Sequence, residues 1–192
     1  MAVTNVLIAG VGGQGAILAS ELLALAAIAA GHDVKQGEFH GVAQRGGAVF
    51  SHVRFGDRVY SPMARRGDVD FLLALEKLEA LRYAHFVRKG GTIIVNDHTV
   101  EPIRVGDTRP YPDDAIESLE SRGFDVVAVK ATEKAIEIGN HRAANVVLLG
   151  TLAGSLDIPD EVWDETFKAR IPEKLLSLNQ QAFSAGRQIP KR

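Results

Sequence analysis

Two glycine-rich stretches are the most informative feature of this chain: residues 6–15, VLIAGVGGQG, and residues 37–47, GEFHGVAQRGG. The first is a short apolar run that ends in closely spaced glycines. The second combines glycines with an imidazole, an amide and a guanidinium. Only one helix and one short strand fit between them. Because ligands of open α/β sheets bind beyond the carboxyl ends of the strands, we expect the functional site at these two stretches.

Composition sets broad limits on the class of protein. The 192 residues, 46% of them hydrophobic, are enough for one well-buried core in a single domain. The net charge of −2 argues against a general nucleic-acid-binding protein, which is normally basic. The chain contains no Cys, which excludes disulfides, a cysteine nucleophile and an iron–sulfur cluster held by cysteines of this chain.

No segment predicts insertion into a membrane or export. The longest apolar stretch, residues 16–30, is interrupted by Ser20 and Glu21 and is too short to span a bilayer. The amino terminus has no basic region of the kind that opens a signal peptide. We therefore expect a cytoplasmic protein without membrane contacts.

Hydrophobic periodicity predicts an α/β fold. Expected strands cover residues 3–9, 33–37, 48–55, 58–61, 69–75, 92–96 and 125–130, and expected helices cover 16–30, 76–86, a stretch after Pro112, 132–139, 142–154, 159–170 and 173–185. Gly56-Asp57 predicts a two-residue hairpin. Pro159 and Pro172 suit first-turn positions and Gly186 suits a terminal cap. The expected architecture is a single three-layer α/β/α domain with a Rossmann-like sheet, a β-hairpin insertion and a helical C-terminal extension. Its core covers about residues 1–155 and the extension about 156–192.

The first glycine stretch allows two interpretations. Gly10, Gly12 and Gly15 fit G-x-G-x-x-G after a strand and before a helix, as in dinucleotide-binding folds, and Glu38 lies where an acidic residue would bind a ribose. However, the predicted chain continues into an antiparallel hairpin rather than into another helix and strand. The alternative is that the glycines only let the helix pack closely on the sheet.

The second stretch and its surroundings are basic. Five arginines and one aspartate between residues 39 and 67 give that segment a charge of +4, from Arg45, Arg54, Arg58, Arg65, Arg66 and Asp57. This segment is either a solvated hairpin face or a site for an anionic group. Arg45 could bind a carboxylate or phosphate with two hydrogen bonds, or it could pair with a nearby acid.

The candidate cofactor-binding residues are therefore those of the two stretches: Gly10, Gly12, Gly13, Gln14, Gly15, Glu38, His40, Gln44, Arg45, Gly46 and Gly47. No catalytic residue is assigned. The six histidines show no metal-ligand spacing, so no metal site is predicted.

A family resemblance adds to this interpretation. The chain resembles the gamma-type domain of 2-oxoacid:ferredoxin oxidoreductases, and within it the small beta subunits of indolepyruvate:ferredoxin oxidoreductases. The residues that carry the resemblance are 10–15, 44–47, 51–56, 61–62, 70–76, 79–82, Gly139, Asn140, Asn145, Leu149, Gly150, Asn179, Ala182 and Phe183. They extend over nearly the whole chain.

The resemblance implies a subunit rather than a complete enzyme. A larger partner subunit would hold thiamine diphosphate and the iron–sulfur clusters, decarboxylate the 2-oxo acid, pass electrons to ferredoxin and transfer the acyl group to coenzyme A. This chain would complete the wall of the active site and could contact coenzyme A, and alone it would be inactive. Two alternatives stay open: a free-standing protein that binds NAD or FAD, and a purely structural docking module.

Overall fold

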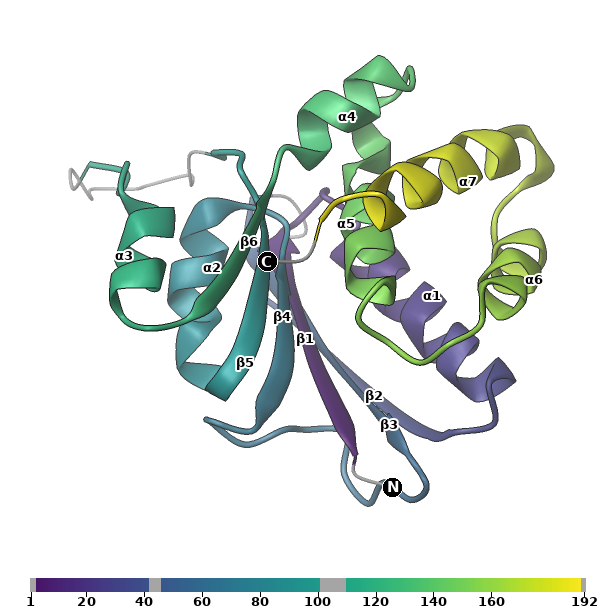
Figure 1. The fold of residues 1–192 in the computed structure, drawn as a ribbon, viewed down its shortest axis with the longest axis horizontal. Helices are drawn as coiled ribbons and strands as arrows, with labels where there is room; N and C mark the ends of the chain where they lie inside the picture. Colours follow the sequence, from purple (N-terminus) through teal and green to yellow (C-terminus); the bar gives the residue numbers. More distant parts are fainter. Residues whose placement is uncertain (1–2, 42–45, 101–109, 191–192) are drawn as a thin grey trace.

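One mixed six-stranded sheet forms the centre of the protein, in the order β2-β3-β1-β4-β5-β6 (Figure 1). We describe it from a computed structural model, which describes residues 3–41, 46–100 and 110–190. The strands are β1 (Thr4–Val11), β2 (Asp33–His40), β3 (Ala48–Gly56), β4 (Val69–Ala74), β5 (Val87–Asn96) and β6 (Asp125–Val129). The α/β fold predicted from the sequence is confirmed.

The strand directions bring four loops to one edge of the sheet. Strands β1, β4, β5 and β6 are parallel to one another, whereas β3 runs antiparallel to both of its neighbours, β1 and β2. The carboxyl ends of the four parallel strands therefore lie together, toward the top of Figure 1. We call this side of the sheet the carboxyl edge.

Helices cover both faces of the sheet. They are α1 (Ala16–Ala29), α2 (Lys77–Tyr83), α3 (Ala115–Ser121), α4 (Ala131–Glu137), α5 (Ala144–Ala153), α6 (Asp160–Arg170) and α7 (Glu173–Arg187), with the short 3-10 turns η1 (Ala84–Phe86) and η2 (His141–Ala143). Helices α2 and α3 lie on one face, and α1 and α5 lie on the other, with α6 and α7 packed outside them (Figure 1).

Strand β1 is apolar on both sides because it supplies both halves of the core. Its side chains alternate between the two faces. Val6 and Ile8 belong to the cluster under α1 and α5, whereas Leu7 and Ala9 belong to the cluster under α2, and all four are completely buried. Burial of each larger side chain contributes about 1.5–3 kcal/mol, so the short apolar run of the sequence becomes the central strand.

The predicted hairpin at Gly56-Asp57 is wrong. Residues 58–61 form no strand, and the antiparallel hairpin consists of β2 and β3 instead. The physical reason is the strand order: β3 already has β1 on one side and β2 on the other, so no edge remains for a third partner. Arg54 holds the chain that follows, because its guanidinium donates to the carbonyl oxygens of Ser61 (2.8 Å) and Met63 (3.1 Å).

The predicted cap at Gly186 is also wrong, whereas the helices themselves are found within a few residues of their expected ends. Helix α7 continues to Arg187, and Gly186 lies inside it against α5. A Cβ atom at Gly186 would overlap the carbonyl oxygen of Val147, and one at Gly150 would overlap that of Phe183. The two glycines therefore let α5 and α7 cross with their backbones in contact.

Pro159 and Pro172 occupy the N-cap positions of α6 and α7. Among the helices of the described residues, none is long and apolar enough to cross a membrane.

Candidate functional site

The two glycine-rich loops meet at the carboxyl edge of the sheet. The backbone N–H of Gly12 donates to the oxygen of Gly47 (2.8 Å), and the N–H of Gly46 donates to the oxygen of Gly12 (3.4 Å). Two stretches that are more than 30 residues apart in sequence thus form one surface. Gln44 and Arg45, which belong to the second loop, lie outside the described residues.

The first loop is closed by its own side chain. The Oε1 atom of Gln14 accepts a hydrogen bond from Val11 N (2.8 Å), and its Nε2 atom donates to the oxygen of Leu75 (3.3 Å). A Cβ atom at Gly10 would lie 3.0 Å from Gln14 Oε1 and 3.1 Å from Leu75 Cβ, so the absence of a side chain at Gly10 leaves room for the Gln14 amide. The Gln14 amide therefore lies in the loop and uses the N–H of Val11, where a dinucleotide-binding loop would leave room and donors for a pyrophosphate.

Helix α1 begins directly after this loop. Gly15 is its N-cap residue with φ +83°, a left-handed conformation that glycine adopts without strain. Asn145 of α5 donates from Nδ2 to the oxygen of Gly15 (3.0 Å). Gly13, with φ +105°, has no atom within 4 Å of the position of a Cβ atom, so its backbone faces open space.

The structure does not bring Glu38 and His40 to the first loop. Both lie on β2, and β3 separates that strand from β1, so their backbone is about 10 Å from β1 at roughly 4.8 Å per strand. Glu38 is exposed and accepts from Gln36 Nε2 (3.0 Å), and His40 Nδ1 donates to the oxygen of Gly41 (3.2 Å). In dinucleotide-binding folds the second strand is the direct parallel neighbour of the first. This geometry removes the support that Glu38 gave to a ribose site.

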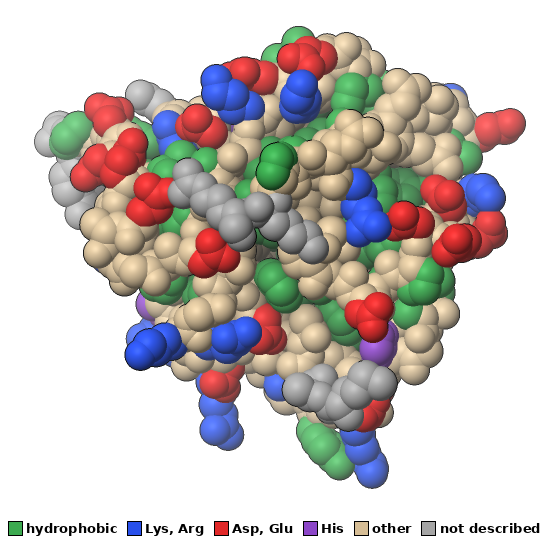
Figure 2. Space-filling model, viewed as in Figure 1, with side chains coloured by type: hydrophobic (Ala, Val, Ile, Leu, Met, Phe, Trp, Pro, Cys, Tyr) green, Lys and Arg blue, Asp and Glu red, His purple; other side chains and the backbone are tan. Residues whose placement is uncertain are grey.

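The described arginines of the basic segment lie at the end of the sheet opposite the glycine loops. Arg54 donates from Nε to Asn5 Oδ1 (2.6 Å), near the start of β1. Arg58, Arg65 and Arg66 lie on the connection 57–68, which joins the end of β3 to the start of β4 at that same end. At about 3.3 Å per residue along β1, these arginines are about 25 Å from the glycine loops. In Figure 2, Lys and Arg side chains project from this lower end of the molecule.

A cavity lies beside the glycine loops at the carboxyl edge. It has a volume of about 320 Å³, and we call it the carboxyl-edge cavity. Residues that follow each of the four parallel strands contribute to its wall, together with η2 and α5. They are Gly13, Gln14, Leu75, Asn96, His98, Val100, Thr132, His141, Arg142, Ala144 and Leu148. Only Gly13 and Gln14 of these residues were predicted as site residues. The one sequence signal for the others is the polar pair Asp97-His98 after a predicted strand.

Asn96 fixes the floor of this cavity. It is 2% exposed, and its Nδ2 atom donates to Thr132 Oγ1 (2.9 Å) and to the oxygen of Leu75 (3.2 Å). Its Oδ1 atom accepts from Thr132 N (3.3 Å). A fully bonded, buried amide of this kind links the ends of β4 and β5 with the start of α4 and makes the wall rigid.

Two buried carboxyl groups lie at the start of α2. Glu76 accepts hydrogen bonds from the Tyr111 hydroxyl (2.6 Å) and from Glu79 N (2.6 Å). Burial, and the hydrogen bond to Glu76, raise the pKa of Tyr111, which therefore stays a donor. Glu79 pairs with Arg82 at 3.0 Å, but its Oε2 atom is buried without a partner among the described residues. Burial raises the pKa of Glu79 to about 7, with a further contribution from Glu76 and an opposing one from Arg82.

His52 lies in an aromatic cluster on the same face of the sheet. It is completely buried, contacts the rings of Phe39, Phe50 and Phe86, and has no hydrogen-bond partner among the described residues at either nitrogen. Burial, and to a smaller extent the nearby Arg54, lower the pKa of His52 to about 4. The imidazole is therefore neutral at physiological pH and serves as a packing group.

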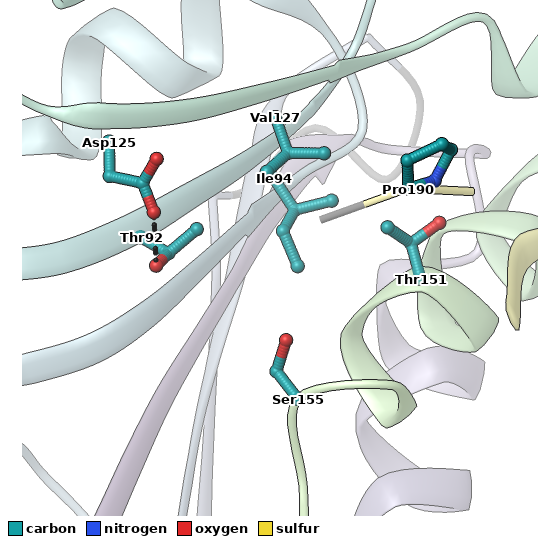
Figure 3. A pocket seen from close by; sticks show the side chains of 7 residues that line it. All are labelled: Thr92, Ile94, Asp125, Val127, Thr151, Ser155 and Pro190. Carbon is teal, nitrogen blue, oxygen red and sulfur yellow. Dashed lines mark hydrogen bonds between the residues drawn. The ribbon is translucent and has the colours of Figure 1, made fainter. Parts of the chain in front are cut away.

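A second cavity, of about 200 Å³, lies away from the carboxyl edge (Figure 3). Its walls come from β5, β6 and the end of α5, and Pro190 closes one side; the labelled residues are Thr92, Ile94, Asp125, Val127, Thr151, Ser155 and Pro190. Its polar groups are mostly bonded within the chain: Thr92 donates to Asp125 (2.9 Å), and Thr151 donates to the oxygen of Val147 (3.2 Å). We therefore take the carboxyl edge as the candidate functional site. The described residues contain no cluster of His, Asp and Glu that could hold a metal ion.

Comparison with known proteins places the chain in a family. Residues 5–189 match the family described as pyruvate ferredoxin/flavodoxin oxidoreductase. The indolepyruvate oxidoreductase subunit IorB of Thermococcus kodakarensis is 38% identical over 95% of this chain and 93% of its own length. The pyruvate/ketoisovalerate oxidoreductases common subunit gamma of the same organism is 29% identical over 91% and 92%.

A solved structure agrees with this assignment. The gamma subunit of a keto/oxoacid ferredoxin oxidoreductase from Geobacter sulfurreducens PCA superimposes with a TM-score of 0.72 at 28% identity, covering 95% of both chains. The family model, the subunits of matching length and this shared fold agree. The chain therefore belongs to the pyruvate ferredoxin/flavodoxin oxidoreductase family, as a subunit of an oxidoreductase for 2-oxo acids.

Proposed function

We propose that this chain is the small, cluster-free subunit of a 2-oxoacid:ferredoxin oxidoreductase that acts on an aryl pyruvate such as indolepyruvate. One observation carries the proposal: the chain corresponds almost end to end to an indolepyruvate oxidoreductase subunit, at 38% identity, against 29% for a pyruvate/ketoisovalerate subunit of the same organism. The complex would oxidatively decarboxylate the 2-oxo acid and transfer the acyl group to coenzyme A, with ferredoxin as electron acceptor.

The residues of this chain do not fit the redox cofactors of such an enzyme. The sequence contains no Cys to hold an iron–sulfur cluster and no Gly-Asp-Gly segment of the thiamine diphosphate type. In our proposal both groups belong to a larger partner subunit. This chain then contributes binding surface and shape rather than reacting groups.

We assign that contribution to the carboxyl edge. There the two glycine loops form one surface, and Arg45 belongs to the loop between Gly41 and Gly46. We propose that Arg45 and these loops contact coenzyme A. Arg54 is unsuited to this role because its guanidinium is bound to Asn5 and to the carbonyl oxygens of Ser61 and Met63 at the other end of β1.

Reconstitution tests the proposed function. The chain is combined anaerobically with a candidate large subunit, and coenzyme A-dependent reduction of a viologen dye is followed with indolepyruvate and with pyruvate. We expect activity only when this chain is present, and a higher kcat/KM for indolepyruvate. Absence of a complex and of activity with any 2-oxo acid would refute the proposal.

The contact with coenzyme A is tested separately in the same complex. Arg45→Ala is compared with Arg66→Ala, which removes an arginine at the opposite end of the sheet. We expect Arg45→Ala to raise the KM for coenzyme A about tenfold, the usual effect of losing one charged hydrogen bond. An unchanged KM would exclude Arg45 from that contact. If every loop variant assembled and turned over normally, the remaining role of this chain would be docking to the partner subunit.

A further inference from the structure

The carboxyl-edge cavity has a one-sided charge. Within the described part of the chain, its wall includes His98, His141 and Arg142 and no Asp or Glu residue. His98 follows β5, whereas the other two residues belong to η2, so the three groups approach the same space from different elements.

Among the described residues, the acidic residues closest in sequence to the wall are bound to other groups. Asp97 pairs with Lys77 (3.4 Å), and Glu133 pairs with Lys130 (3.3 Å). Glu76 is buried and accepts from Tyr111 and from Glu79 N. Within the described part of the chain, no side chain accepts a hydrogen bond from the Arg142 guanidinium. The positive charge of this wall therefore has no carboxylate counterpart among these residues.

Neutral donors in the wall also point to an anion. Asn96 donates to the oxygen of the Thr132 hydroxyl (2.9 Å), so this hydroxyl has its own proton left to donate elsewhere. Gly13 also lines the cavity, and its backbone faces open space and allows a ligand to approach closely. A cavity of about 320 Å³ at the carboxyl ends of parallel strands has both the size and the position usual for small-molecule sites.

We propose that the carboxyl-edge cavity binds a phosphate group of a small molecule, through Arg142, His98, His141 and the hydroxyl of Thr132. A phosphate offers more acceptor oxygens and more negative charge than a carboxylate and thus suits several donors that converge from different elements. Coenzyme A, a free nucleotide and inorganic phosphate share this chemistry. Only the choice of coenzyme A as one of the ligands rests on the proposed function.

Isothermal titration calorimetry on the full chain tests the site with three probes: inorganic phosphate, ADP and coenzyme A. Arg142→Gln is compared with Arg66→Gln, a matched loss of one exposed arginine at the opposite end of the sheet. We expect binding by the wild type, at least a tenfold higher Kd for Arg142→Gln, and an unchanged Kd for Arg66→Gln. His141→Gln provides a second variant at the site, and the thermal midpoint of each variant shows whether it folds.

The results separate the possible ligands. Tight binding of coenzyme A with weak binding of phosphate and ADP, all dependent on Arg142, identifies coenzyme A as the source of the phosphate. Equal binding of ADP or phosphate identifies a free phosphate ligand.

Absence of binding for all three probes, or equal losses in Arg142→Gln and Arg66→Gln, would overturn the proposal. These measurements need no partner subunit. The phosphate site can therefore be refuted while the reconstituted complex is active, and it can be supported while the complex shows no activity.

Discussion

The side chain of Asn145 joins helix α5 to the first glycine loop, because its Nδ2 atom donates to the carbonyl oxygen of Gly15 at 3.0 Å. The two residues are 130 positions apart in the sequence. Asn145 is 3% exposed, and its Oδ1 atom accepts from Val146 N (2.9 Å). The bond therefore fixes the start of α1, and with it the loop, to the second half of the chain.

Asn145→Ala tests this relationship. The Gly15 oxygen keeps its hydrogen bond from Ala19 N (3.1 Å), but the buried N–H of Val146 is left without a partner, which costs about 1–3 kcal/mol. We expect the free energy of unfolding in urea to fall by that amount. Gln181→Ala is the control, at an exposed position of α7 where the amide donates to Ser177 Oγ (3.2 Å), and it should change the free energy of unfolding by less than about 0.5 kcal/mol. Equal values for the two variants would show that the bond adds no stability.

Gly186→Ala tests the crossing of α5 and α7. The new Cβ atom would overlap the carbonyl oxygen of Val147, which is backbone and cannot turn away as a side chain can. The helices must separate, so we expect a loss of about 3 kcal/mol or more in thermal or chemical unfolding. Ser184→Ala, an exposed position on the same helix, should be nearly neutral. A stable Gly186→Ala variant would mean that the helices can move apart at little cost.

Glu79→Gln tests the buried carboxyl under α2. Burial raises the pKa of Glu79 from an ordinary 4.5 to about 7, so the folded protein binds a proton there that the unfolded chain has lost. The protonated Glu79 therefore contributes its full stabilisation below about pH 4.5, and this stabilisation is lost as the pH rises through 7. The Gln variant has no such titration. Its stability relative to the wild type should therefore rise by about 3 kcal/mol between about pH 4 and about pH 8, measured by urea unfolding at each pH. A constant difference would contradict the raised pKa.

His52→Leu tests the buried imidazole and has the opposite sign. Burial lowers the pKa of His52 from 6.5 to about 4, so between these values the unfolded chain binds a proton that the folded protein does not. Wild-type stability from this residue therefore falls as the pH is lowered from 6.5 to 4, by about 3 kcal/mol. The Leu variant should lose that dependence, and its stability relative to the wild type should rise toward acid pH. His85→Gln, on the exposed side of η1, is the control.

The contributions of His52 and Glu79 to the pH dependence of wild-type stability have opposite signs over this range, so only the separate variants reveal them.

Local patterns in the sequence were sufficient to predict the strands, the helices and the glycine loops. The apolar run before Gly10 predicted β1 because a strand buried on both faces is apolar at every position, and the alanine- and leucine-rich stretch that follows predicted α1. The two glycine loops were predicted at the ends of their strands, where the structure joins them through Gly12 and Gly47. These features depend on residues near one another in the chain, so local patterns were sufficient.

Which elements lie side by side could not be predicted from these patterns and is seen in the folded protein. Strand order placed β3 between β1 and β2, which excluded a strand at 58–61, moved Glu38 away from the glycine loop and sent the basic connection 57–68 to the opposite end of the sheet. The crossing of α5 and α7 made Gly186 a packing position rather than a cap. The carboxyl-edge cavity joins Gln14 with Asn96 and Arg142, residues that no spacing rule connects. Local patterns specify strands and helices, whereas pairing and packing depend on burial across the whole chain, and these placed the cavity beside the loops.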